Sequence, residues 1–452
     1  MKRDFTGQQI VVVGAGRTGV ALCAYFSRRG ARVTLSDQRS AERIEGLANL
    51  PKDTRTDFGG HTEALFQAAD LIAVSPGVPL SVPAIAKAAT AGVPVVGEIE
   101  VAFAEIEAPL VAITGTNGKS TTTTVMGEVF QAWGKKTFVG GNLGTPLIEA
   151  VDTDSWQWLV AELSSFQLEA IEHFRPRYAL LLNISEDHLD RYADMKAYVQ
   201  AKAQIFVNQT ADDVAVLNAE DEAVCALGKG LVASKVYFSS ARVLEEGMGC
   251  DGTHIVWNWK KQTQRFPLAE LRLKGLHNVE NVMAALIPPL LEGCPAATAW
   301  QATCRFGGLA HRMVPVRTLD GVTWYDDSKG TNVGSVVKSL SGLPAPVTLI
   351  AGGKDKGGDY LPLAGVVKEK VSHLILIGQA TERIAQCLEK LTHTIRAASL
   401  EEAVRMAHEL TPAGGTVLLS PGCSSFDMFS SYIERGERFA DLVMDLPEKN
   451  RN

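Results

Sequence analysis

Cysteine is scarce in this chain of 452 residues, and its seven residues follow no disulfide or metal-binding pattern. They are odd in number, far apart and never spaced as Cys-x-x-Cys. A disulfide framework and a zinc knuckle are therefore excluded. Because thiols without partners are typical of a reducing compartment, we expect a cytoplasmic protein.

Long apolar runs and a strong charge of one sign are missing as well. No stretch approaches the roughly 18 residues of a membrane helix, and the N-terminus passes almost directly into an expected strand at 10–13. We expect neither a signal peptide nor a membrane span. The 44 Lys and Arg against 51 Asp and Glu leave a net charge of −7, which favours neither nucleic acid nor a membrane as a partner. We expect a monomer.

The composition that is present is ordinary for globular proteins, with 46% hydrophobic and 21% charged residues. At about 150 residues per domain, the length predicts three domains. Apolar runs alternate with helical patterns, which favours α/β domains with parallel sheets. The expected strands are 10–13, 32–35, 71–74, 110–113, 158–161, 178–183, 322–325, 347–351, 373–377 and 416–419.

A glycine-rich loop, Gly14-Ala15-Gly16-Arg17-Thr18-Gly19, follows the first expected strand, and Asp37 ends the second. This spacing meets the dinucleotide fingerprint, in which glycines admit a diphosphate and the acid accepts from a ribose hydroxyl. Any nucleotide diphosphate can use such a loop, so NAD, NADP, another nucleotide and a plain tight turn all stay open. Ser75-Pro76-Gly77 follows the third strand at the same sheet edge, as a ligand loop or a rigid turn.

A second loop has the order of a triphosphate cradle: strand, glycine-rich loop, lysine, hydroxyl and helix. Gly115-Thr116-Asn117-Gly118-Lys119-Ser120-Thr121 follows the strand from Leu110 and precedes a helix that reaches about Trp133. We expect Lys119 to contact the β- and γ-phosphates of ATP and Ser120 to offer its hydroxyl to Mg²⁺. Ile113 stands where the general pattern has Gly or Ala, which indicates a shortened variant.

Two breaks in the alternating pattern divide the chain. A new strand, loop and helix unit begins at Leu110, and another alternating series follows residues 305–309. We predict a Rossmann-like domain at 1–98, a central P-loop ATPase-like domain at 99–309 and a Rossmann-like, doubly wound domain at 310–452. Short alternating segments between Val232 and Leu273 predict a β-rich, antiparallel insertion in the central domain.

Acidic and imidazole side chains follow two strands of the central domain. Glu162 closes one buried-looking strand, and His188 follows the strand at 178–183. Oxygen ligands with one imidazole suit Mg²⁺ or Mn²⁺ better than zinc, and a capping or packed histidine is the alternative at His188. Lys202 lies within a helical pattern that by itself favours an exposed lysine.

The second loop resembles the ATP loop of the Mur ligases, which build the peptidoglycan stem peptide and whose family includes folylpolyglutamate synthetase. Within that family, 13–20 and 35–39 resemble the members that add D-glutamate, and the resemblance covers nearly the whole chain in three blocks. It implies a cytoplasmic peptidoglycan-precursor enzyme that joins D-glutamate to UDP-N-acetylmuramoyl-L-alanine through an acyl phosphate, with release of ADP and phosphate. It also implies that the domains close around the reacting groups.

The resemblance further implies which residues contact each substrate. ATP would lie on Gly115, Thr116, Asn117, Gly118, Lys119, Ser120, Thr121, Asn278, Asn281, Arg312, Asp327 and Lys329, in the central and third domains. The uridine substrate would lie on Arg17, Thr18, Asp37, Gln38, Arg39, Ser75, Gly77, Asn142, Ser164 and His188, chiefly in the first domain. D-Glutamate would lie on Thr331, Lys356, Ser425 and Phe426 in the third domain.

The catalytic set implied by the resemblance is Lys119, His188 and Lys202. Two Mg²⁺ ions, for which Mn²⁺ could substitute, would be held by Ser120, Glu162, His188 and Lys202, the last as a carbamate. Carbamylation turns an ammonium into an anionic ligand, which suits two metal ions beside a triphosphate.

Three other functions stay open from the sequence. The first is an NAD-dependent oxidoreductase with an ATP-regulated module, which rests on the Gly14 loop and Asp37. The second is a nucleotide-binding module without catalysis. The third is a sibling ligase that adds L-alanine, meso-diaminopimelate or L-lysine.

Overall fold

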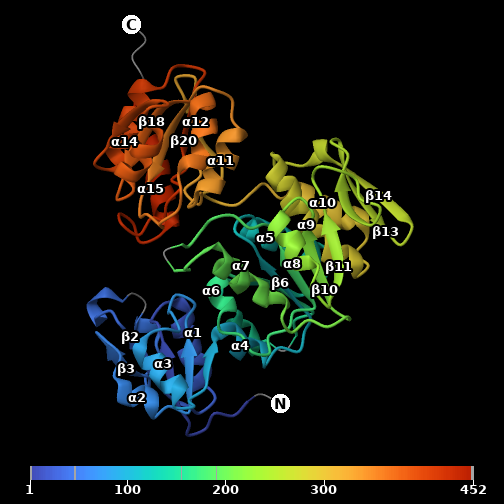
Figure 1. Cartoon of the computed structure of the whole chain (residues 1–452), viewed down its shortest axis with the longest axis vertical. Coiled ribbons are helices and arrows are strands. Elements are labelled where there is room, and N and C mark those ends of the chain that lie inside the picture. The colour runs from blue at the N-terminus through green and yellow to red at the C-terminus, as the bar shows by residue number, and fades with distance from the viewer. Residues whose placement is uncertain (1–2, 45–46, 154, 190, 449–452) are drawn as a thin grey trace. The chain divides into compact units, whose positions relative to one another are not determined.

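The computed structural model describes residues 3–44, 47–153, 155–189 and 191–448. These residues form three β-sheets flanked by helices and divide into two compact units (Figure 1). The first unit comprises 1–183, 199–271 and 278–305, and the second comprises 184–198, 272–277 and 306–452. The α/β class predicted from the alternating pattern is confirmed, and all seven cysteines are free thiols as expected. Among the described residues, no helix combines the length and apolar character needed to cross a membrane.

The first sheet is parallel, in the order β3-β2-β1-β4-β5 (blue in Figure 1). The strand order reverses between β1 and β4, where open sheets bind ligands at the carboxyl ends of their strands. Its strands are β1 (Gln9–Val13), β2 (Arg32–Asp37), β3 (Arg55–Phe58), β4 (Leu71–Val74) and β5 (Val95–Gly97). Its helices are α1 (Arg17–Ser27), η1 (Ala41–Arg43), η2 (Leu47–Asn49), α2 (Glu63–Gln67), α3 (Pro83–Thr90) and α4 (Glu98–Phe103).

The central sheet has the order β14-β13-β12-β11-β10-β9-β6-β8-β7. Because β6 lies between β8 and β9, the loops that follow these three parallel strands share one edge. Its strands are β6 (Leu110–Thr114), β7 (Thr137–Gly141), β8 (Trp158–Glu162), β9 (Tyr178–Leu181), β10 (Val214–Asn218), β11 (Ser234–Phe238), β12 (Gly247–Cys250), β13 (His254–Trp259) and β14 (Gln262–Pro267). The helices around it are α5 (Lys119–Ala132), η3 (Leu147–Asp152), α6 (Ser165–Leu168), α7 (Met195–Ala203), η4 (Gln204–Phe206), α8 (Glu222–Gly228), η5 (Leu268–Glu270), α9 (Leu276–Leu291) and α10 (Ala296–Arg305).

The predicted β-rich insertion is part of this same sheet. Its strands β12, β13 and β14 pair antiparallel, as predicted. The expectation is wrong for β11, which pairs parallel with β10. Helix α8 connects β10 to β11, and a helical crossover returns the chain in the same direction.

The third sheet has the order β15-β16-β20-β17-β18-β19 and is parallel except for β15. Alternate residues of its strands face two hydrophobic clusters, one with α11, α12 and α13 and the other with α14 and α15, so the doubly wound prediction is confirmed. Its strands are β15 (Val314–Leu319), β16 (Val322–Asp326), β17 (Val347–Gly352), β18 (Val371–Ile377), β19 (His393–Arg396) and β20 (Thr416–Leu419). Its helices are α11 (Val333–Ser341), η6 (Leu361–Leu363), α12 (Ala364–Lys370), α13 (Thr381–Leu388), α14 (Leu400–Leu410) and α15 (Tyr432–Met444).

Two buried glutamates of α4 join the first sheet to the central sheet within the first unit. Glu100 accepts the N–H groups of residues 172–174 at 2.8–3.0 Å. Glu98 is 2% exposed, and its Oε1 accepts the Ile148 N–H at 2.7 Å while its Oε2 is buried without a hydrogen-bond partner. Burial raises the pKa of Glu98 from 4.5 to about 7.

We expect Glu98→Gln to remove a pH dependence of stability. Since the pKa of Glu98 is higher in the folded than in the unfolded chain, the folded state binds the proton more tightly between pH 4.5 and 7. Wild-type stability therefore falls as pH rises through that window, by about 3 kcal/mol from this group. Urea unfolding at pH 5 and pH 8 measures the free energy of unfolding at each pH. If this free energy differs between the two pH values by as much in Glu98→Gln as in the wild type, the raised pKa of Glu98 is contradicted.

Candidate functional site

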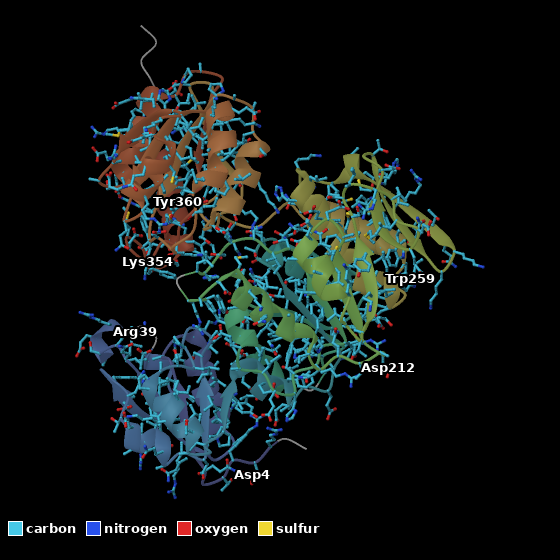
Figure 2. The ribbon with its side chains drawn as sticks, in the orientation of Figure 1. Asp4, Arg39, Asp212, Trp259, Lys354 and Tyr360 are labelled. Carbon is cyan, nitrogen blue, oxygen red and sulfur yellow. The ribbon has the colours of Figure 1, made fainter. Side chains whose placement is uncertain are left out.

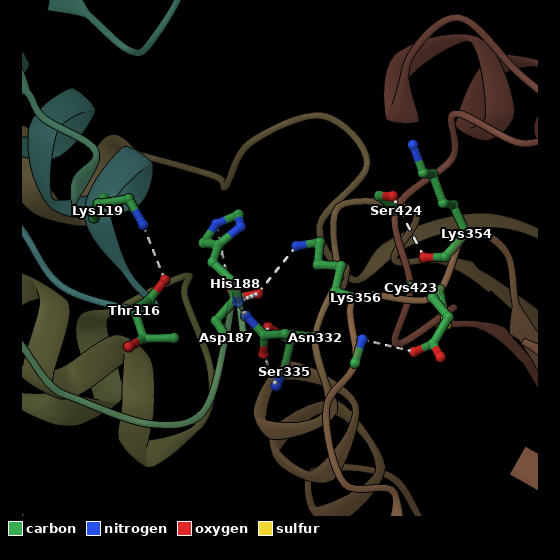
Figure 3. A network of polar contacts seen from close by, with 12 residues as sticks. Thr116, Lys119, Asp187, His188, Asn332, Ser335, Lys354, Lys356, Cys423 and Ser424 are labelled. Carbon is green, nitrogen blue, oxygen red and sulfur yellow. Dashed lines mark hydrogen bonds and ion pairs between the residues drawn. The ribbon is translucent and has the colours of Figure 1, made fainter. Parts of the chain in front are cut away.

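The phosphate loop of the first unit joins β6 to α5, as the sequence predicts. Gly118 has φ +88°, a left-handed conformation that glycine adopts without strain. Lys119 Nζ donates to the carbonyl oxygens of Gly115 and Thr116, both at 2.9 Å (Figure 3). The Thr116 N–H donates to the carbonyl of Asn183, just beyond β9, at 2.9 Å. Neighbouring strands thus shape the loop.

A carboxylate and a second lysine flank this loop. Glu162 ends β8 and is 3% exposed; its Oε1 accepts the Asn142 amide at 2.7 Å, and its Oε2 is buried without a hydrogen-bond partner. Lys202 of α7 is 1% exposed and donates Nζ to the Gly115 carbonyl at 2.9 Å. The exposed lysine that the helix pattern favours is therefore wrong, because α7 turns this side chain toward the loop.

Helix α9 places Asn278 and Asn281, the two asparagines predicted to contact ATP, beside the same loop. The Thr122 hydroxyl of α5 donates to the Asn281 carbonyl at 3.4 Å, and the Asn281 amide donates to Asn278 Oδ1 at 3.3 Å. A Cβ on Gly118 would collide with Asn281 Oδ1, so this close approach requires glycine. Ser120 and Thr121, in the first turn of α5, are buried.

The glycine-rich loop of the first sheet is held by Asp37, whose oxygens are both engaged. Oδ2 accepts the Ala15 N–H at 2.7 Å. The guanidinium of Arg39 (labelled in Figure 2) donates to Oδ1 at 3.0 Å and to Oδ2 at 2.9 Å. The pKa of Asp37 is lowered to about 2, since these hydrogen bonds outweigh burial. The Ser75 hydroxyl donates to the Gly14 carbonyl at 3.0 Å. The two loops predicted for the uridine substrate therefore meet at the reversal of strand order.

The remaining residues predicted for the uridine substrate have varied surroundings. Arg17 lies 3.8 Å from Glu149 in an exposed ion pair, and its Nη2 donates to the Thr145 hydroxyl at 3.4 Å. Ser164 is the N-cap of α6, and its hydroxyl accepts the Gln167 N–H at 3.2 Å. Thr18 lies in α1, and Gln38 and Gly77 lie in the loops after β2 and β4.

In the second unit, strand order gathers three loops at one edge of the third sheet. Because β20 lies between β16 and β17, the loops after these three parallel strands are neighbours. The loop after β16 carries Asp327, Lys329 and Thr331, and the loop after β17 carries Lys356. The loop after β20 carries Ser425, so residues predicted for ATP and residues predicted for D-glutamate lie on neighbouring loops.

Asp327, predicted to contact ATP, is buried at this edge. Its Oδ2 accepts the hydroxyls of Ser339 and Ser420, each at 2.7 Å. Burial raises the pKa of Asp327 to about 6, and the two hydroxyls oppose that rise. Lys329 lies over the ring of Tyr432 at 5.2 Å, and the Arg312 Nε is buried without a hydrogen-bond partner.

A cavity of about 160 Å³ in the second unit lies between segment 184–188 and the third-sheet domain. Asp187 spans it: its Oδ1 accepts Lys356 Nζ at 3.1 Å and its Oδ2 accepts the Asn332 amide at 3.3 Å (Figure 3). His188 and Thr331 also line this cavity. Its volume is below the roughly 300–1,000 Å³ of sites for drug-sized ligands, which fits an occupant as small as an amino acid.

The loop after β20 presents amide donors. Ser425 is 2% exposed, and its carbonyl accepts the N–H groups of Met428 and Phe429 at 3.1 and 2.8 Å. Among the described residues, the N–H groups of Ser425 and Phe426 donate no hydrogen bond. The Phe426 side chain is 68% exposed. A carboxylate is the group that such a pair of amides can bind.

Lys119, Glu162 and Lys202 belong to the first unit, whereas His188 belongs to the second. The predicted convergence of His188 with Lys119 and Glu162 stays a prediction. Among the described residues, no three or more His, Cys, Asp or Glu side chains form a group that could hold a metal ion. Mg²⁺ bound with phosphates usually takes one or two carboxylates together with substrate oxygens and water.

Sequence reasoning missed several residues of the site. Asp187 stands beside His188, but its contacts with Lys356 and Asn332 join distant segments. Asn183 is the last residue of the strand expected at 178–183, a position that could have marked it. Arg435, in α15, follows no motif, and only the fold shows its contacts with two loops of the site.

Three family models match the chain. They describe a MurD-like Mur ligase N-terminal domain at 8–97, the Mur ligase middle domain at 113–288 and a Mur ligase glutamate ligase domain at 311–423. A UDP-N-acetylmuramoylalanine–D-glutamate ligase from Syntrophotalea carbinolica is 63% identical over 444 residues, covering 98% of this chain and 99% of that protein. A ligase of the same name from Geotalea uraniireducens is 52% identical over 450 residues, with 98% and 99% covered.

Solved structures share the fold at lower identity. MurF from Acinetobacter baumannii has a TM-score of 0.64 at 15% identity, with 98% of this chain and 92% of that one covered. A pseudomurein peptide ligase type C from Methanothermus fervidus has a TM-score of 0.61 at 18% identity, with 92% and 97% covered. These likenesses support the three-domain α/β architecture.

We expect Glu162→Gln to weaken magnesium-dependent nucleotide binding by at least about tenfold, because the buried Oε2 loses its charge. The Asn142 contact persists through the amide oxygen, so the melting temperature without ligand should change little. The measurement is the melting-temperature increase caused by MgCl₂ with a non-hydrolysable ATP analogue, against the exposed Glu222→Gln as control. A wild-type increase in Glu162→Gln would refute a metal role for Glu162.

Proposed function

Because this chain belongs to the Mur ligase family, we propose that it joins D-glutamate to UDP-N-acetylmuramoyl-L-alanine in an ATP-dependent reaction that forms ADP and phosphate. The observation that carries the proposal is the edge of the third sheet. There, Lys356 lines a small cavity, and two amides without acceptors lie in the neighbouring loop after β20, which suits an amino acid with two carboxylates. The names of relatives at 52–63% identity support D-glutamate as that amino acid.

The first step requires a carboxylate to attack the γ-phosphate. Two like charges about 4 Å apart repel by roughly 4 kcal/mol at an effective dielectric of 20. Lys119 donates to two carbonyls of its own loop, so its ammonium is held where a triphosphate would lie. We propose that Lys119 exchanges these contacts for phosphate oxygens and offsets the repulsion in the transition state.

Magnesium fits the residues of the phosphate loop. The buried Glu162 Oε2 has no hydrogen-bond partner, and the Ser120 hydroxyl lies in the first turn of α5. We propose that Ser120, Glu162, His188 and carbamylated Lys202 hold two ions, with Mn²⁺ as a substitute. When bound, such ions neutralise charge on phosphate oxygens. We assign His188 to this ligand role, and a neutral imidazole could otherwise accept a proton from the incoming amine.

The amino acid would enter the cavity that Asp187 spans. Lys356 is paired with Asp187, so a substrate carboxylate must compete for this lysine. Thr331 lines the same cavity, and the Ser425 and Phe426 amides would bind the second carboxylate. The amine of D-glutamate then attacks the acyl phosphate, which forms the amide and releases phosphate.

Two observations argue against an NAD-dependent oxidoreductase and against a sibling ligase. Asp37 has both oxygens occupied by Ala15 and Arg39, which leaves less capacity for the ribose contact of an NAD enzyme. A sibling ligase for L-lysine or meso-diaminopimelate would bring a second ammonium to a cavity that already holds Lys356. We further propose that the enzyme is a cytoplasmic monomer, supported by its free thiols and modest net charge.

The test is ADP release with UDP-N-acetylmuramoyl-L-alanine and a panel of amino acids. We expect turnover with D-glutamate and none with L-glutamate, L-alanine, L-lysine or meso-diaminopimelate. Lys119→Ala should lower the rate of phosphate release by at least about 10³-fold. The dissociation constant of the uridine substrate should stay near the wild-type value. Turnover with another amino acid alone would overturn the substrate, and loss of both properties in Lys119→Ala would overturn the separate nucleotide sites.

The carbamate on Lys202 has a direct spectroscopic test. Its amine is buried beside the phosphate loop, where it donates to the Gly115 carbonyl at 2.9 Å. With ¹³C-bicarbonate, we expect a carbamate resonance in the wild type and in the exposed Lys196→Met control, and none in Lys202→Met. Identical spectra for Lys202→Met and wild type would show that another lysine, or none, is modified.

A further inference from the structure

Arg435 is among the most deeply buried charged side chains of the second unit. It lies in α15 and is 1% exposed. Its Nε donates to the Ser328 hydroxyl at 3.0 Å and its Nη2 to the Ser328 carbonyl at 2.8 Å. Its Nη2 and Nη1 also donate to the carbonyls of Cys423 and Ser424, at 3.3 and 3.4 Å. One guanidinium therefore joins the loop after β16 to the loop after β20.

The hydrogen bonds of this guanidinium go to neutral groups, and the charges of Asp326 and Asp427 act on it only from beyond ion-pair distance. Among the described residues, Arg435 forms no ion pair, and all four acceptors are neutral oxygens. Arg438, three residues later in the same helix, is half exposed and paired with Glu401 at 2.9 Å. Burial lowers the pKa of Arg435 to about 10, so it stays charged at neutral pH. A buried unpaired cation is costly, which argues for a purpose beyond packing.

The Ser424 carbonyl, which accepts the Lys354 N–H at 2.9 Å as well as Arg435 Nη1, also determines where an amide points. In a planar trans peptide, the carbonyl and the following N–H point in opposite directions. Because the Ser424 carbonyl faces Arg435, the Ser425 N–H faces away from it. That N–H is one of the two without an acceptor, so the guanidinium and the free amide lie on opposite sides of one peptide unit.

Helix α15 supports the other loop by two further contacts. The Ser328 hydroxyl donates to the Tyr432 carbonyl at 2.8 Å. A Cβ on Gly436 would collide with the ring of His311, which is hydrogen-bonded to Asp326 at 2.6 Å. The start of α15 thus forms a platform under the loop that carries Asp327, Lys329 and Thr331.

We propose that Arg435 is a positioning residue for amino-acid and ATP binding: it ties the Ser328 loop to the Cys423–Ser425 loop, aims the Ser425 amide at the substrate carboxylate and places a positive charge behind it. This inference rests on the proposed function, since it assigns that site an anionic amino acid. The uridine substrate is assigned by the proposed function to loops of the first sheet, to which the described hydrogen bonds of Arg435 do not run.

The test compares Arg435→Met and Arg435→Lys with Arg438→Met in the full chain. For Arg435→Met we expect the KM for D-glutamate to rise at least about tenfold and that for ATP at least about threefold. The dissociation constant of the uridine substrate should stay within about twofold. Arg435→Lys keeps the charge but loses the fork that reaches both loops, so its KM for D-glutamate should lie between wild type and Arg435→Met. Arg438→Met should match wild type.

Unchanged KM values for D-glutamate in a folded Arg435→Met would overturn the proposal, as would an equal change for all three substrates. If Arg435→Met does not fold, Arg435→Lys decides: an unchanged KM for D-glutamate overturns the proposal, and a rise of at least about threefold supports it. Failure of the proposed function is distinguishable, because it appears as absent D-glutamate turnover in the wild type. The same KM comparison then uses whichever amino acid the wild type ligates.

Discussion

The order of strands in a parallel sheet decides which loops can share a ligand, and this constraint underlies both halves of the site. In the central sheet, β6 lies between β8 and β9, so the phosphate loop is flanked by Glu162 and Asn183. In the third sheet, the last strand, β20, inserts between β16 and β17. Segments about 100 residues apart in sequence, such as Ser328 and Ser424, therefore meet at one edge.

Buried charges without complete pairing mark where ligands are expected to complete the structure. Glu162 keeps one carboxylate oxygen without a partner, and the guanidinium of Arg435 donates to neutral oxygens. Leaving charged groups in this state is costly in a folded protein. Nucleotide phosphates, metal ions and a dicarboxylic amino acid carry the charges that would compensate it. The groups that are unfavourable to bury in the folded protein are thus the ones proposed to bind the charged substrates and metal ions.

Much of the fold could be read from local patterns, because strands buried on both faces are continuous apolar runs. The strands β1, β6 and β17 lie where such runs predict them. Strands at sheet edges escaped the prediction, since β3 and β19 carry charged residues at exposed positions. The parallel pairing of β11 was also missed, because alternation along one strand carries no information on the direction of its neighbour.

The sequence by itself determined the phosphate loop, the glycine-rich loop and the α/β class, since each depends on residues that are close along the chain. Only the tertiary structure decided that Lys202 is buried, that Asp187 holds Lys356 and that Arg435 joins two loops of the site. Those contacts depend on which strands become neighbours, and neighbours are selected by the packing of whole helices and sheets rather than by any local pattern.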